Sequence, residues 1–141
     1  MSKLLHRLSD ASRSGVYRVA RAQEVLDAAA GSGLRVYRVR LGRAADKDAL
    51  MTSFAESLEL PRWFGRNWDA LEDCLSDLSW SQASGHVLLI EGADALAADE
   101  RGILLDVLGS AAAHWAGRGR PFFAVLVGGS EELAALYREK R

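Results

Sequence analysis

The chain has 141 residues, 49% of them hydrophobic and 26% charged, which excludes a disordered tail or a fibre and fits a single globular domain. No stretch approaches the roughly 20 apolar residues of a membrane helix, and the N-terminus lacks the apolar run of a signal peptide. The single cysteine, Cys74, cannot form an internal disulfide, so we expect a protein of the reducing cytoplasm.

The net charge of −1 hides a strong segregation of charge along the chain. Residues 1–43 carry nine basic and three acidic side chains, residues 44–100 carry three and twelve, and residues 101–141 carry six and four. The acidic excess therefore lies in the middle of the chain, where it must meet a positive partner or tolerate its own repulsion.

The first 33 residues are predicted to form an N-terminal extension to the main domain. The sequence GVYRV at 15–19 fits a short strand, and AQEVLDAAA at 22–30 fits a helix. Residues 1–13 show no clear preference, and GSG at 31–33 predicts a turn. The main domain is expected to span residues 34–141.

The main domain begins with a predicted strand at residues 34–41, where apolar side chains alternate with arginines. Asp46 can cap the helix that follows, in which apolar residues recur every four positions from Leu50 to Leu58. Pro61 ends this segment, because the residue before a proline avoids the helical conformation.

A second helix is predicted from Trp68 to about Leu78, with Gly65 in the turn before it and Asn67 as its N-cap. At about 100° per residue, one side of this helix is apolar. The opposite side is acidic and carries Asp69, Glu72, Asp73 and Ser76. Residues 67–80 also include Asp77 and contain no lysine or arginine, so the acidic charge is uncompensated along the chain.

Two continuous apolar runs, HVLLI at 86–90 and FFAVLV at 122–127, predict strands buried on both faces of a parallel sheet. A helix from Asp99 to about Trp115 connects them, and the SEEL that begins at residue 130 indicates a last helix at 130–141. This order predicts an α/β fold with a small three-stranded parallel sheet packed with helices. The strand of the N-terminal extension is a candidate fourth.

Few side chains could serve an enzyme. The candidates for a nucleophile or a metal site are Cys74, His6, His86 and His114, and they form no short-spaced set of metal ligands. Cys74 falls on the apolar side of its helix, and the carboxylates of Asp69 and Asp73 project from a face that should stay ionised. We therefore expect no enzymatic activity, no metal and no cofactor.

Nucleic-acid binding is an alternative suggested by the first core strand and the residues just after it, which carry Arg35, Arg38, Arg40 and Arg43 around Tyr37. A basic strand with an aromatic side chain can follow a phosphate backbone. The same pattern also fits the solvent-facing row of an ordinary strand, and the acidic segment that follows would repel a polyanion. Direct binding of nucleic acid is therefore the less favoured reading.

Protein binding explains the acidic helix better than solvation alone. The face has a single sign, it lacks the Glu to Lys pairs that stabilise surface helices, and it follows Trp63 and Phe64 on a turn where at least one aromatic side chain should be exposed. Aromatic side chains beside carboxylates that a partner can desolvate form a typical binding hot spot. A basic cleft would be the natural complement.

These residues carry a resemblance to a known family. The sequence LPRWFGRNWDALEDCL at 60–75 resembles the signature of the barstar family, LPxYYGxNxDALWDCL. Members of that family are intracellular inhibitors of small ribonucleases of the barnase class. The resemblance implies a barstar-like fold from residue 34, and inhibition by a helix and its preceding loop that enter the nuclease active site in place of substrate phosphates.

By matching position, the resemblance gives candidate partner-binding residues. It makes Asp73 the central carboxylate and Asp69 a second one, with Glu72 in place of a family tryptophan. By the same match, Trp63 stands in place of an interface tyrosine, and Gly65 and Asn67 are loop contacts. Two further aromatic candidates come from outside the match: Phe64 beside Trp63, and Trp80, which fits an aromatic edge of the interface and packing at the helix end equally well.

The expected partner is a small basic ribonuclease or nuclease toxin, bound by a protein that is monomeric beforehand. Arg62 and Arg66 stand where barstar itself is acidic, which implies a partner whose rim carries acid near them. An interaction module with a non-nuclease partner remains the alternative.

Overall fold

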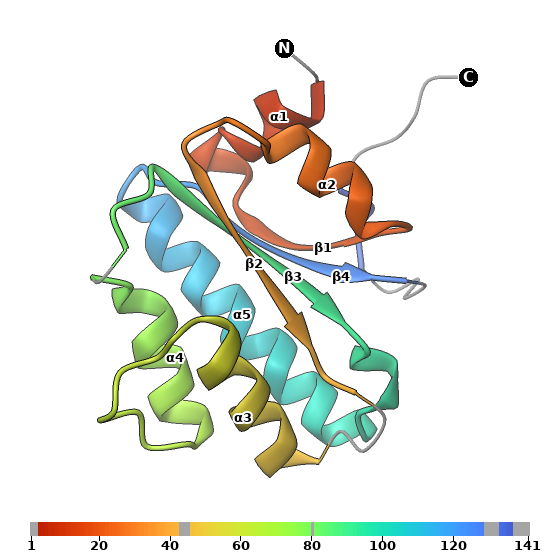
Figure 1. Ribbon diagram of the computed structural model, residues 1–141, viewed down its shortest axis with the longest axis vertical. Coiled ribbons are helices and arrows are strands. Elements are labelled where there is room, and N and C mark those ends of the chain that lie inside the picture. The colour runs from red at the N-terminus through yellow and green to blue at the C-terminus, as the bar shows by residue number, and fades with distance from the viewer. Residues whose placement is uncertain (1–2, 43–45, 80, 129–132, 137–141) are drawn as a thin grey trace.

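The computed structural model describes residues 3–42, 46–79, 81–128 and 133–136. A parallel sheet lies between two layers of helices (Figure 1). Its strands are β1 (Gly15–Val19), β2 (Leu34–Arg40), β3 (Gly85–Glu91) and β4 (Phe122–Val127), in the order β1-β4-β3-β2. The predicted α/β class with a parallel sheet is confirmed, and the candidate fourth strand is present, since β1 pairs with β4.

The central strands β3 and β4 divide their side chains between two cores, as the period of a strand requires. Leu88, Ile90, Phe122, Ala124 and Leu126 belong to one core, and Val87, Leu89, Phe123 and Val125 belong to the other. Both strands therefore bury apolar side chains on both faces, which explains their continuous apolar sequences.

The first core lies under the three helices α3 (Lys47–Ser57), α4 (Trp68–Asp77) and α5 (Ala98–Gly117). Local caps set where two of them begin: the Asp46 side chain accepts a hydrogen bond from the Ala49 amide at 2.8 Å, and the Asn67 side chain accepts one from the Ala70 amide at 2.8 Å. Both N-caps and the extents of these helices agree with the sequence pattern.

The second core is covered by the N-terminal residues, from α1 (Lys3–Leu8) and α2 (Ala22–Ala29). Leu4 and Leu8, one helical turn apart on α1, are buried there with Val25 of α2. The sequence pattern indicated α2 but gave no prediction for α1 or for the short 3-10 helix η1 (Ala11–Arg13). The N-terminal extension is thus a layer of the fold that packs directly on the sheet (Figure 1).

The predicted helix at 130–141 is wrong where the structure describes that segment. Residues 133–136 run beside β1, where the Arg18 amide donates to the Ala134 carbonyl and the Leu136 amide donates to the Arg18 carbonyl, each at 2.9 Å. The Arg18 side chain also donates to the Leu133 carbonyl at 2.8 Å. Pairing with an edge strand satisfies these backbone groups in place of helical bonds. The rest of the predicted helix lies outside the described residues.

A completely buried histidine, His86, lies at the start of β3. Its Nε2 is 2.9 Å from the Ser81 hydroxyl, and its ring stacks on Tyr37 at a centroid distance of 6.4 Å and lies 5.8 Å from Trp115. Burial, reinforced by the positive charges of Arg120 and Arg35, lowers the pKa of His86 from 6.5 to about 4.

We expect this histidine to make stability depend on pH. Below about pH 6.5 the unfolded chain binds a proton that the folded chain accepts only near pH 4, so stability falls as the pH drops through that window. The loss should approach about 3 kcal/mol, the free-energy equivalent of the pKa shift. Urea unfolding at pH 7 and pH 4.5 measures it. A His86→Gln variant starts from lower stability but should lose less over the same interval, and equal losses in the two proteins would contradict this explanation.

Candidate functional site

The acidic face of α4 is accessible in the structure. Leu71, Cys74 and Leu75 hold the opposite side of the helix in the core. Asp69, Asp73 and Asp77 are exposed and Glu72 is half-buried. Within the part of the chain that the structure describes, none of these four carboxylates is in an ion pair. The negative charge of α4 is therefore available to an external partner.

The two aromatic side chains before α4 point in different directions, one toward solvent and one into the core. The Trp63 side chain is 63% exposed, whereas Phe64 is buried in the first core. A turn in which the Phe64 amide donates to the Pro61 carbonyl at 2.9 Å sends these neighbouring side chains to different sides. At least one exposed aromatic was expected, and it is Trp63. Phe64, the other candidate for partner binding, is buried and anchors the loop from inside.

Gly65 and Asn67 are exposed, and they shape the entrance to α4. Besides capping the helix, the Asn67 side chain donates to the Gly65 carbonyl at 3.3 Å. A Cβ at position 65 would lie 3.3 Å from the Asn67 Nδ2 and 3.4 Å from the Ala70 Cβ, which is tight. A side chain larger than glycine would thus crowd the cap that fixes the helix start.

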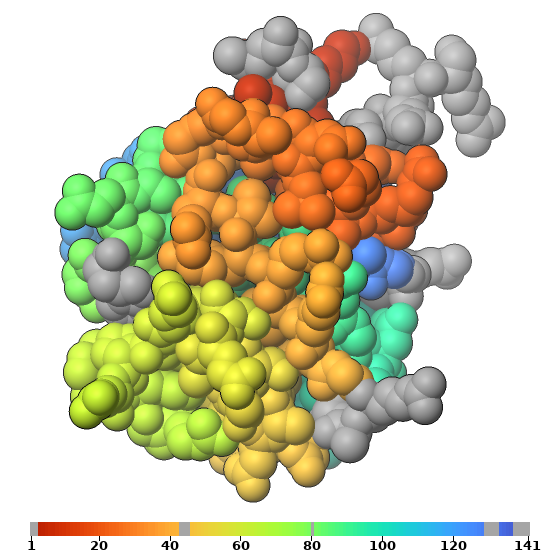
Figure 2. All heavy atoms as spheres, in the orientation of Figure 1, coloured from red at the N-terminus to blue at the C-terminus, as the bar shows by residue number. Residues whose placement is uncertain are grey.

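Arg66 is exposed, but its guanidinium is hydrogen-bonded within the molecule. Its backbone has a φ of 55°, a conformation that L-residues seldom adopt, and its Nη2 donates to the Thr52 hydroxyl of α3 at 2.6 Å and to the Asp48 carbonyl at 3.4 Å. Arg66 therefore ties the loop carrying Trp63 to α3. In the space-filling view, α3, the loop at 58–67 and α4 form one continuous surface (Figure 2).

We expect loss of this tie to loosen the loop. Arg66→Ala and Thr52→Val should each cost roughly 1 kcal/mol, the usual value of one hydrogen bond, and the double variant should cost little more than either. Amide hydrogen exchange at residues 62–66 should rise in all three. Arg62→Ala is the matched control, because Arg62 is exposed and has no hydrogen-bond partner among the described residues. Unchanged exchange in the Arg66 variant would show that the tie does not order the loop.

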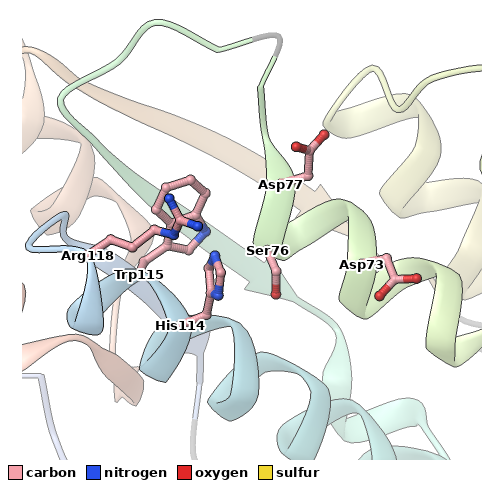
Figure 3. A pocket seen from close by; sticks show the side chains of 6 residues that line it. All are labelled: Asp73, Ser76, Asp77, His114, Trp115 and Arg118. Carbon is pink, nitrogen blue, oxygen red and sulfur yellow. The ribbon is translucent and has the colours of Figure 1, made fainter.

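A hollow of about 250 Å³ adjoins the acidic face (Figure 3). Asp73, Ser76 and Asp77 line it from α4, and His114, Trp115 and Arg118 line it from the end of α5. The Trp115 Nε1 donates to the Leu75 carbonyl at 2.7 Å, which holds the two helices together at this point. The hollow is thus bounded by two helices in fixed contact.

The Cys74 side chain lies behind this surface rather than on it. It is completely buried, and burial together with the negative charges of Asp77 and Asp73 raises the pKa of its thiol. A thiol in that state is a poor nucleophile at neutral pH. Cys74 therefore contributes to packing.

The arginines of β2 are largely engaged within the molecule. Arg38 and Arg40 both approach the Glu91 carboxylate, at 3.1 Å and 3.6 Å, and the Arg35 guanidinium lies 5.0 Å from the centre of the Tyr37 ring. Arg43 lies outside the described residues. Because Glu91 offsets part of this charge, β2 is a weaker candidate for a phosphate-binding surface than its sequence indicates.

Trp80, the remaining candidate contact, lies outside the described residues. Among the helices that the structure describes, none combines the length and the apolar character needed to cross a membrane.

Comparison with known proteins agrees with this arrangement. No curated protein sequence matches the chain. The family model described as Barstar (barnase inhibitor) matches residues 34–127, about two thirds of the chain. The match runs from β2 to β4 and includes α4 with its preceding loop, whereas α1, β1 and α2 lie outside it. The chain therefore belongs to the barstar family.

Proposed function

We propose that this protein inhibits a small basic ribonuclease or nuclease toxin by inserting α4 and the Trp63 loop into the active site. The observation that carries the proposal is that Asp69 and Asp73 are exposed and unpaired, within the described residues, beside an exposed tryptophan. Had internal salt bridges neutralised these carboxylates, the surface could not replace a phosphate backbone. The family match, whose description names a barnase inhibitor, supports this reading.

The physical basis is the chemistry of a nuclease cleft. Such a cleft is shaped and charged for phosphate, and a carboxylate reproduces the bidentate contact that arginine makes with phosphate. The Asp73 carboxylate would occupy the centre of the cleft and Asp69 a second phosphate position. Trp63 would stack at the rim with its flat ring. The concentrated negative charge should also accelerate encounter, an effect that salt weakens.

A role in protection follows from this mechanism. An inhibitor that occupies the catalytic cleft protects the cell that produces the nuclease, provided that the inhibitor is present in the cytoplasm. A monomer leaves α4 and the loop free for the nuclease before binding.

The proposal is tested by capturing partners from the secreted proteins of the producing organism. The parent protein and Asp73→Asn serve as baits, since the substitution removes the central charge and keeps the side-chain shape. We expect the parent alone to retain a small basic protein that degrades RNA, and excess parent to stop that degradation. A non-nuclease partner retained by the parent, or a nuclease retained equally by both baits, would contradict the proposed function.

A further inference from the structure

The surface that carries Asp73 continues across the hollow onto α5, and there its charge changes sign. Asp73 and Asp77 line the hollow on the α4 side, and His114 and Arg118 line it on the α5 side (Figure 3). The hollow is therefore bipolar, with carboxylates on one side and a guanidinium on the other. A partner that covers the Asp73 end of α4 and extends across the hollow would also meet the Arg118 guanidinium.

Arg118 is free in a way that the neighbouring arginine is not. The Arg120 guanidinium lies 5.2 Å from the centre of the Trp115 ring and donates to the Ala83 carbonyl, so it is used in packing. Arg118 is exposed and has neither a hydrogen-bond nor an ion-pair partner for its side chain among the described residues. Its position at the C-terminus of α5 suits a cation, because the helix dipole is negative there. The positive charge thus lies at the hollow without an ion pair to any carboxylate of the described residues.

The volume of the hollow admits part of a partner. At about 250 Å³ it exceeds the roughly 30 Å³ of one water molecule several times over, so an entering side chain can displace water from it. An entering base would approach Asp73 and Asp77, whereas an acid would approach Arg118. A partner with only bases at this place would leave Arg118 facing a like charge, which is unfavourable in a desolvated interface.

We infer that Arg118 selects the partner: this face fits a nuclease whose basic cleft is bordered by a carboxylate opposite Arg118, and it disfavours one whose border is basic there. The inference rests on the proposed function and adds the charge pattern of the cognate nuclease. Selection of this kind works as much by repelling the wrong partner as by attracting the right one.

The test uses barnase as a basic ribonuclease and measures its inhibition and its dissociation constant with the parent, Arg118→Glu and Arg21→Glu. Arg21 is the matched control: its replacement changes the net charge equally, and α2 covers the opposite face of the sheet. We expect Arg118→Glu to bind barnase at least about tenfold more tightly than Arg21→Glu, with the gain shrinking at high salt. Arg118→Gln should give an intermediate gain, and it avoids placing an acid at the helix C-terminus.

The outcomes distinguish failure of the role given to Arg118 from failure of the proposed nuclease inhibition. If Arg118→Glu binds barnase no better than Arg21→Glu while the parent inhibits barnase or a captured nuclease, this inference is overturned and the proposed function stands. If neither the parent nor Arg118→Glu inhibits barnase or any nuclease captured from the producing organism, the proposed function fails and this inference falls with it.

Discussion

Replacing Asp73 with alanine is expected to weaken binding to the proposed nuclease partner by well over about 2 kcal/mol, the threshold of a hot spot, and to leave the fold intact. The fold should survive because the Asp73 side chain is exposed and outside both cores. Binding should suffer because the arginines of the nuclease, desolvated in the complex, would lose their counter-charge. An aspartate of barstar is a standard example of such a hot spot, and the resemblance implies that Asp73 takes its place, so the size of the effect comes from the family. Calorimetric titration of the captured nuclease measures it.

A matched control separates this contact from the general loss of negative charge. Asp27→Ala removes the same charge from α2, on the opposite side of the sheet, and should change the affinity by no more than about 0.5 kcal/mol. Asp73→Asn keeps the shape without the charge and should lose most of what alanine loses. If the Asp73 and Asp27 variants bind equally well, the acidic face of α4 is not the centre of the interface.

Much of the fold could be predicted because its signals are local. The continuous apolar runs of β3 and β4 and the alternation in β2 depend only on neighbouring residues, and so does the amphipathic pattern of α4 with Asn67 as its cap. The segment at 133–136 could not be predicted this way, because its pairing with Arg18 depends on a strand far away in the chain. The local sequence favours a helix there, but pairing with the edge strand β1 satisfies the backbone groups instead.

The candidate site also has features that local sequence predicts and features that depend on tertiary contacts. Its acidic residues were evident from their spacing on one helix. Which of Trp63 and Phe64 turns inward depends on the core beneath the loop, and the tie between Arg66 and Thr52 spans fourteen positions without any motif. Arg118 was also missed, because its importance comes from the facing wall of a hollow that only the packing of α4 on α5 creates. Local periodicity thus finds the charged helix, and tertiary contacts decide what surrounds it.

Removing residues 1–33 is expected to abolish stable folding, although the family match begins only at residue 34. The deletion takes away β1 and both helices over the second core. It would expose four side chains of the central strands that are now completely buried, namely Val87, Leu89, Phe123 and Val125. At about 1.5–3 kcal/mol each, the loss is roughly 6–12 kcal/mol, which equals the whole stability of a typical domain.

Circular dichroism and urea unfolding of the 34–141 fragment test this expectation, with binding of a hydrophobic dye to detect the exposed sheet. Leu8→Ala in the full chain provides a graded version, since truncating a completely buried leucine costs about 2–5 kcal/mol. His6→Ala, exposed on the same helix, should cost little. A fragment that unfolds cooperatively with the stability of the parent would mean that the N-terminal layer merely lies against a self-sufficient barstar domain. Loss of folding would instead show that the N-terminal layer is required for the fold that holds the acidic face of α4 in place.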